Sequence, residues 1–104
     1  DYLVSSSNSE IKLWNLDSGK CVNTIDSEDG MISFIKEIKL RGKDMIIASG
    51  GSDKSIKLWN VETSKLISRF IGHSDNVKDI VQPKYESGFV LLSVGADRKI
   101  KFWK

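Results

Sequence analysis

Short stretches of alternating apolar and polar residues follow one another along this chain, separated by residues that favour turns. In residues 11–15, for example, Ile11 and Leu13 fall on one face of an extended strand, and Lys12 and Trp14 fall on the other. The pattern predicts about ten short strands, over residues 1–5, 11–15, 21–25, 32–40, 45–49, 55–60, 66–71, 76–82, 89–94 and 100–103. Over residues 32–40, where the alternation is irregular, a helix is the weaker alternative. Turns spaced this closely indicate an all-β sandwich, barrel or propeller.

One strand pattern occurs three times, as IKLWN at residues 11–15 and 56–60 and as IKFWK at residues 100–104. Its three tryptophans, Trp14, Trp59 and Trp103, are separated by 45 and 44 residues. A repeat of this length is typical of solenoids, propellers and arrays. Because a unit holds up to four short strands, the repeat favours a β-propeller in which each unit forms one blade.

Composition and charge fit an ordinary globular protein. The chain is 39% hydrophobic and 29% charged, and its 16 Lys and Arg exceed its 14 Asp and Glu by too little to indicate a nucleic-acid or membrane surface. Cys21 is the single cysteine, and the sequence contains neither a signal-peptide pattern nor an apolar run that could span a bilayer. We therefore expect an intracellular, reducing location and no membrane insertion. We also expect the chain to be a segment of a longer protein.

The last unit carries the most complete set of motif residues. It contains Gly72-His73, then Leu91-Leu92-Ser93, Gly95-Ala96-Asp97 and residues 100–103. This order resembles the WD-repeat family of β-propellers. The resemblance implies that His73, Ser93, Asp97 and Trp103 form a buried hydrogen-bonded chain that holds the blade together. Such a chain makes physical sense because buried imidazole, hydroxyl and indole groups must find partners.

The other two units match the same pattern less fully. The middle unit offers Ser49, Asp53 and Trp59 to a network of this kind, but Gly30-Met31 stands where a Gly-His pair is expected. In the first unit Trp14 is present, with Val4 at the serine position and Asn8 at the aspartate position. The aspartate that usually follows the tryptophan is replaced in all three units, by Asn15, Asn60 and Lys104.

Aligning the units predicts about two and a half four-stranded antiparallel blades. Residues 1–25 would be the last three strands of one blade, 26–71 a complete blade, and 72–104 the first three strands of the next. Propellers close with about 4–8 blades, so the remaining blades would come from the rest of the parent chain or from another chain.

No catalytic, metal or cofactor site is expected. His73 and Cys21 fall on different blades, so they do not make a nucleophilic pair, and no cluster has metal-ligand spacing. The turn aspartates and the tryptophans recur at equivalent positions, which favours structural roles. Lys12, Lys57 and Lys101 also recur, and we interpret them as charged side chains whose stems pack along apolar surface.

The sequence therefore predicts a non-catalytic scaffold that binds protein or peptide partners on its loop rims within a multiprotein complex. The residues expected to contact a partner are Lys54, His73, Ser74, Asp75, Asn76, Arg98 and Lys99 on one rim, and Tyr85 in the loop 83–88 on the other. The acidic loop of Asp26, Glu28 and Asp29 makes the first rim mixed in sign. The alternative is an RNA- or DNA-associated propeller subunit of a ribonucleoprotein assembly, with phosphate contacts from Lys54, Arg98, Lys99 and Lys101.

Overall fold

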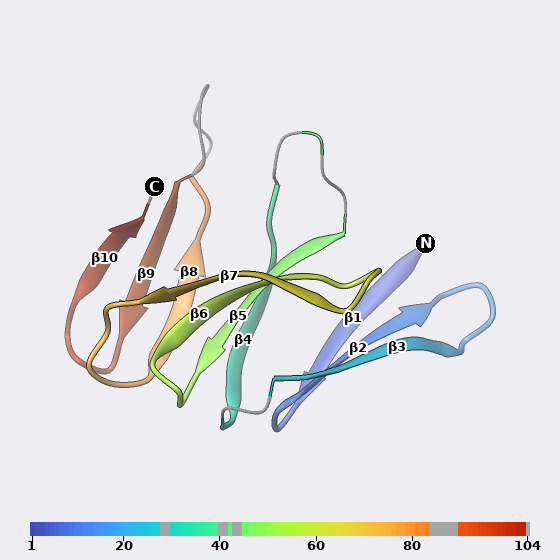
Figure 1. Cartoon of the computed structure of the whole chain (residues 1–104), viewed down its shortest axis with the longest axis horizontal. Helices are drawn as coiled ribbons and strands as arrows, with labels where there is room; N and C mark the ends of the chain where they lie inside the picture. Colours follow the sequence, from blue (N-terminus) through green and yellow to red (C-terminus); the bar gives the residue numbers. More distant parts are fainter. Residues whose placement is uncertain (28–29, 40–41, 43–44, 84–89, 104) are drawn as a thin grey trace.

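The chain folds into antiparallel β-sheets, which confirms the predicted all-β class. The structure, a computed structural model, describes residues 1–27, 30–39, 42, 45–83 and 90–103. Within these ranges there is no helix. The strands are β1 (Tyr2–Ser7), β2 (Glu10–Asn15), β3 (Cys21–Asp26), β4 (Ile32–Glu37), β5 (Ile46–Gly51), β6 (Ser55–Asn60), β7 (Lys65–Ile71), β8 (Val77–Val81), β9 (Leu91–Gly95) and β10 (Ile100–Trp103) (Figure 1). No helix in the described part is therefore long and apolar enough to cross a membrane.

The strands form three separate sheets. The first sheet has the order β1-β2-β3, the central sheet β4-β5-β6-β7, and the last sheet β10-β9-β8. Every neighbouring pair is antiparallel, and neighbours in space are also neighbours in sequence. Each sheet is thus a simple meander, the arrangement that short connections between strands favour.

The central sheet is packed between the other two. One apolar cluster joins the first and central sheets through Ile11, Leu13, Ile47, Trp59 and Val61, among others. A second joins the central and last sheets through Ile46, Ala48, Leu58, Ile80 and Leu91, among others. Because both of its faces are covered, β5 is buried at all six positions. Successive side chains of a strand point to opposite faces, so Ile46 and Ile47 reach different clusters.

Equivalent positions of the three repeats face the same way. Ile56 and Leu58 pack toward the last sheet and are 0% and 3% exposed, whereas Trp59 packs toward the first sheet and is 7% exposed. In the last sheet, Trp103 contacts Phe70 of the central sheet with ring centroids 5.4 Å apart. Trp59 and Trp103 therefore lie between sheets, as core residues do.

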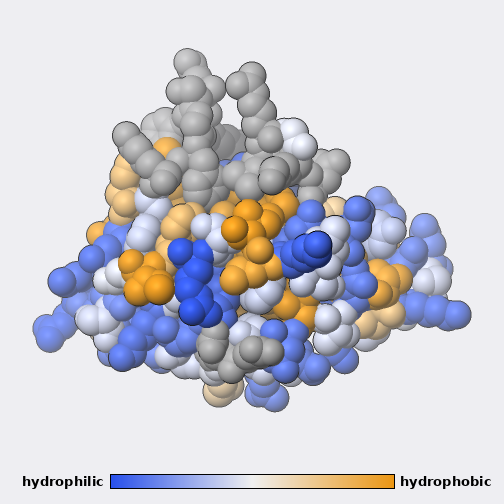
Figure 2. Space-filling view, in the orientation of Figure 1, coloured by the Kyte–Doolittle hydropathy of each residue, from blue (hydrophilic) through white to orange (hydrophobic). Residues whose placement is uncertain are grey.

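The turns that join β1 to β2, β5 to β6 and β9 to β10 lie at one end of the sheets, with the connection between β7 and β8 (Figure 1). We call this end the turn rim and define it as residues 8–9, 52–54, 72–76 and 96–99. The connections at 16–20 and 61–64 lie at the other ends of their strands. On the face seen in Figure 2, apolar residues gather toward the middle and polar residues surround them.

Candidate functional site

A continuous chain of hydrogen bonds connects the last sheet to the turn rim. The Trp103 indole N–H donates to Ser93 Oγ at 2.8 Å, and His73 Nε2 lies 2.7 Å from the same oxygen. His73 Nδ1 lies 3.0 Å from Asp97 Oδ2. A carboxylate only accepts, so Nδ1 carries a proton, and in the neutral ring Nε2 then accepts from the serine hydroxyl. The four residues thus form the chain that the family resemblance implied.

Asp97 bonds to the backbone of the turn rim in addition to His73. Its carboxylate accepts from the backbone amides of Ser74, at 3.0 Å, and Lys99, at 3.1 Å. Burial alone would raise the pKa of the Asp97 carboxyl, but these amides and the His73 ring outweigh burial, so the pKa lies below its usual value. Asp97 is therefore a charged anchor for two segments of the rim.

Close packing around this network requires a glycine in β9. A Cβ atom on Gly95 would lie 2.7 Å from His73 Nδ1 and 2.9 Å from Asp97 Oδ1. Both distances are below van der Waals contact, so any larger residue would displace the imidazole or the carboxylate. The Gly95-Ala96-Asp97 motif thus has a steric cause.

The central sheet has an equivalent serine and tryptophan, but the group described beside its aspartate is a lysine ammonium. The Trp59 indole donates to Ser49 Oγ at 2.9 Å, and Asp53 accepts from the amide and hydroxyl of Ser55. The buried Lys57 ammonium donates to the Ser27 carbonyl at 2.9 Å, lies 3.4 Å from Asp53 Oδ2, and stands 5.8 Å from the Trp59 ring centroid. Sequence reasoning recognised only the packing of the Lys57 stem. Its ammonium ties the turn to the connection that precedes β4.

A small cavity lies beside Lys57 in the central sheet. It has a volume of about 10 Å³, and Ser27, Ser49, Asp53, Ser55 and Lys57 are among its lining residues. A volume of this size holds at most one water molecule. As lined by the described residues, this cavity is therefore too small for an organic ligand.

Hydrogen bonds between the strands show which position of the central sheet corresponds to His73. The Ser52 amide donates to the Met31 carbonyl, as the Ala96 amide donates to that of Asn76. Met31 is thus the counterpart of Asn76, and Ser27 is the counterpart of Gly72. The prediction that Gly30-Met31 replaces a Gly-His pair is wrong. The counterpart of His73 is position 28, which lies outside the described residues.

The first sheet also differs from the predicted alignment. Trp14 Nε1 donates to Ser5 Oγ at 2.9 Å, and Ser5 pairs with Lys12 across the strands just as Ser49 pairs with Lys57. Ser5, and not Val4, is therefore the serine counterpart. The cause is a turn of two residues, 8–9, where the central sheet has three, 52–54. Asn8, expected at the aspartate position, adopts a positive φ of 52°.

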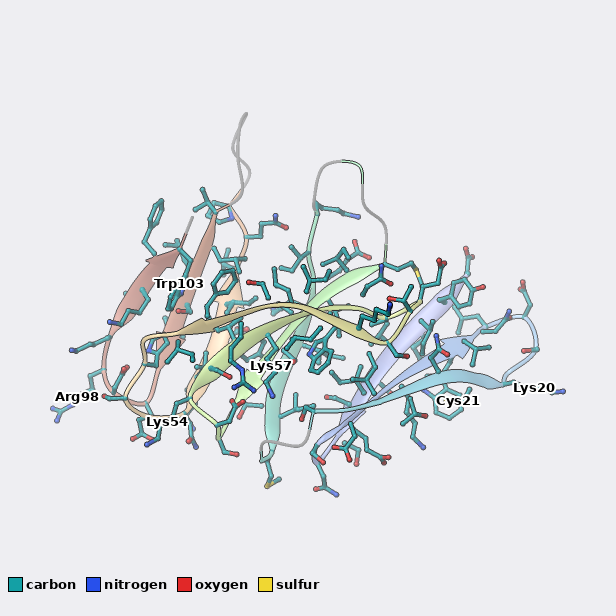
Figure 3. All side chains as sticks on the ribbon, in the orientation of Figure 1. Lys20, Cys21, Lys54, Lys57, Arg98 and Trp103 are labelled. Carbon is teal, nitrogen blue, oxygen red and sulfur yellow. The ribbon has the colours of Figure 1, made fainter. Side chains whose placement is uncertain are left out.

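The predicted contact residues of the turn rim lie together. Lys54, Ser74, Asp75, Arg98 and Lys99 are exposed and Asn76 is half-buried, whereas His73 is buried in its network. Figure 3 shows Lys54 and Arg98 at the same end of the molecule. Lys101 lies in β10 opposite Ser93, away from the turn. Tyr85, Glu28 and Asp29 fall outside the described residues.

Cationic residues occupy the strained position of two turns. Lys54 has a φ of 69° and Arg98 a φ of 66°, in the left-handed region that favours glycine and asparagine. Both amides close their turns by donating to the carbonyls of Gly51 and Gly95. Both side chains are exposed, so the turns present fixed positive charges to solvent. Among the described residues, no three potential metal ligands converge.

Comparison with known proteins agrees with the repeat. The family described as WD domain, G-beta repeat matches residues 19–60 and 64–104. A p21-activated protein kinase-interacting protein 1-like protein from Danio rerio is 32% identical over 110 residues, which cover 93% of this chain and 30% of the relative. The chain thus spans under a third of that relative's length. Two matched repeats and a meander of four strands at its centre show that this chain belongs to the WD-repeat family and forms a segment of a β-propeller.

Proposed function

We propose that this chain is part of a non-catalytic scaffold whose turn rim binds protein or peptide partners within a multiprotein complex. The observation that carries the proposal is the rim itself, where exposed polar side chains stand on turns fixed by buried hydrogen bonds. Asp97, for instance, anchors both the 72–76 connection and the 96–99 turn. Fixed loops lose little entropy on binding, which favours recognition. Catalysis is not proposed because His73, Ser93 and Asp97 bond to one another and to the protein backbone.

The relative suggests a first candidate partner. Its name describes it as interacting with a p21-activated protein kinase. We propose a kinase of this kind as the first partner to test, together with an intracellular location. The supporting fact is sequence similarity over nearly the whole of this chain.

We further propose that each sheet is one blade, with blade limits at 1–25, 26–71 and 72–104, and that further blades complete the propeller. The support comes from equivalent positions. Ile56 and Leu58 are buried by the next sheet, whereas their counterparts Ile100 and Phe102 are 75% and 53% exposed. Covering such a face is favourable by roughly 25 cal/mol per Å² of apolar surface, so another blade there would stabilise the array.

Cross-linking tests the use of the rim. The intact protein is captured from its native cells, with and without nuclease, treated with a lysine-reactive cross-linker and analysed by mass spectrometry. We expect partner proteins that survive nuclease and cross-link to Lys54 and Lys99. Lys20 and Lys65, exposed at the other ends of the strands, are the internal control. Cross-links confined to Lys20 and Lys65 would contradict the rim proposal, and loss of all partners with nuclease would favour the ribonucleoprotein alternative.

A further inference from the structure

Two turns of the rim carry a cation at the same position. Lys54 and Arg98 are equivalent residues, because the amide of each donates to the carbonyl of the glycine that ends the preceding strand, Gly51 or Gly95. Both side chains are exposed, and Figure 3 shows them at the same end of the molecule. The exposed Lys99 follows Arg98. We call Lys54, Arg98 and Lys99 the basic segment.

The first two of these cations hold a backbone conformation that other residues adopt more easily. A positive φ costs free energy for a side chain with a Cβ, and glycine and asparagine tolerate it best. The turn of the first sheet has Asn8 there, with a φ of 52°, whereas Lys54 has 69° and Arg98 has 66°. Backbone strain of this kind is common at functional sites. The geometry of the turns therefore does not explain why these two residues are cationic.

The charges of the basic segment have no carboxylate partner. In the described part of the chain, none of its three cations forms an ion pair. The aspartates of the same turns bond elsewhere, since Asp53 contacts Lys57 and Asp97 contacts His73. These aspartates thus hold the turns in shape and leave the exposed cations available to a partner.

We propose that the basic segment binds a carboxylate-rich segment of a protein partner. The partner's carboxylates would supply the missing counter-charges, and the guanidinium of Arg98 can hold one carboxylate with two parallel hydrogen bonds. This inference rests on the proposed function and specifies the chemistry of the partner. A nucleic acid fits less well, because its regularly repeated phosphates would meet the exposed acids Asp75, on the same rim, and Glu10, beside the 8–9 turn.

The key variant combines Lys54→Gly and Arg98→Gly. It removes two charges, and glycine suits both positive φ values, so folding is preserved. Two controls separate charge from backbone. Ser64→Gly relieves a φ of 61° at the other ends of the strands without changing charge. Lys20→Ala with Lys65→Ala removes two exposed charges there.

The measurements are made on the intact protein at about 50 mM salt, with fluorescent octaglutamate and with oligouridylate of the same charge. We expect octaglutamate to bind more tightly than oligouridylate. The double glycine variant should weaken octaglutamate binding about fivefold, as the loss of two exposed ion pairs predicts, and should raise the urea midpoint because two strained residues are relieved. Ser64→Gly should raise the midpoint and leave binding unchanged. The Lys20 and Lys65 control should also leave binding unchanged.

An unchanged affinity in the double glycine variant would overturn the inference. An equal loss of affinity in either control, or tighter binding of oligouridylate than of octaglutamate, would overturn it as well. The scaffold proposal fails separately, because it depends on the captured partner. A partner protein that still cross-links to Lys54 and Lys99 would leave that proposal standing with a different chemistry of recognition.

Discussion

The central and last sheets place tryptophan, serine and aspartate at equivalent positions and connect them differently. In the last sheet, the His73 imidazole lies between Ser93 and Asp97, so one chain of hydrogen bonds runs from the indole to the turn. In the central sheet, the Lys57 ammonium contacts Asp53 and the Ser27 carbonyl, and Ser49 bonds to the tryptophan.

This difference shows what the fold requires at these positions. An imidazole can donate with one nitrogen and accept with the other, whereas an ammonium only donates. Lys57 therefore holds the aspartate and the preceding connection but cannot replace the relay through serine. No buried side-chain nitrogen or oxygen in the described part is without a partner. The requirement is thus a satisfied set of polar groups at the turn and not one particular residue.

The largest effect is expected at the tryptophan shared by both arrangements. Trp59→Ala should lower the free energy of unfolding by about 3–5 kcal/mol, because it removes a large buried ring between two sheets and leaves a cavity. Trp59→Phe keeps most of the packing and loses only the hydrogen bond to Ser49, so its loss should be smaller. Urea unfolding of the intact protein measures both. An unchanged transition for Trp59→Ala would show that the ring does not hold the sheets together.

The lysine connection is tested by Lys57→Met, which retains the apolar stem and removes the ammonium. We expect a loss of about 2–3 kcal/mol, because the half-buried Asp53 carboxylate and the Ser27 carbonyl lose a charged hydrogen-bond donor. Lys101→Met is the matched control at the equivalent position of the last sheet, where the lysine is half-buried and has no hydrogen-bonded or ionic partner in the described part. Equal urea midpoints for the two variants would mean that Lys57 contributes only its stem.

The histidine connection should make the last sheet sensitive to acid. The pKa of Asp97 is lowered in the folded protein, so its contribution is complete above the pKa of the unfolded carboxyl, about 3.9, and is lost as pH falls through the folded value. Asp97→Asn should reduce stability at neutral pH and flatten this acid dependence. Urea midpoints at several pH values below about 5 test this. A variant as acid-sensitive as wild type would assign the loss to other carboxylates.

The sequence predicted the strands, the all-β class and the network of the last sheet because all three follow from local patterns. Apolar alternation marks a strand wherever it occurs, and a repeated tryptophan marks the same place in each unit. His73, Ser93, Asp97 and Trp103 stand in one unbroken set of motifs, so their alignment needed no knowledge of turn lengths.

The errors arose where turn lengths differ. The sequence alignment puts Val4 at the serine position, but the first sheet's turn is one residue shorter, so Ser5 takes that place. Met31 was aligned with His73 although hydrogen bonds align it with Asn76. The role of the Lys57 ammonium depends on Ser27, a residue of another connection 30 positions away. Periodicity carries no information about such contacts.

The smallest effect on stability is expected at Lys99. Its substitution distinguishes the hydrogen-bond network from the exposed surface that the network holds in place. Only its backbone amide bonds to Asp97, and its side chain is exposed. Lys99→Ala should therefore change the free energy of unfolding by less than about 0.5 kcal/mol, as surface substitutions usually do, while weakening the binding of a partner on the turn rim. Urea unfolding and a titration with the captured partner measure the two effects separately. A clear loss of stability would place the Lys99 side chain within the network of the last sheet, and a partner affinity equal to wild type would remove it from the contact surface.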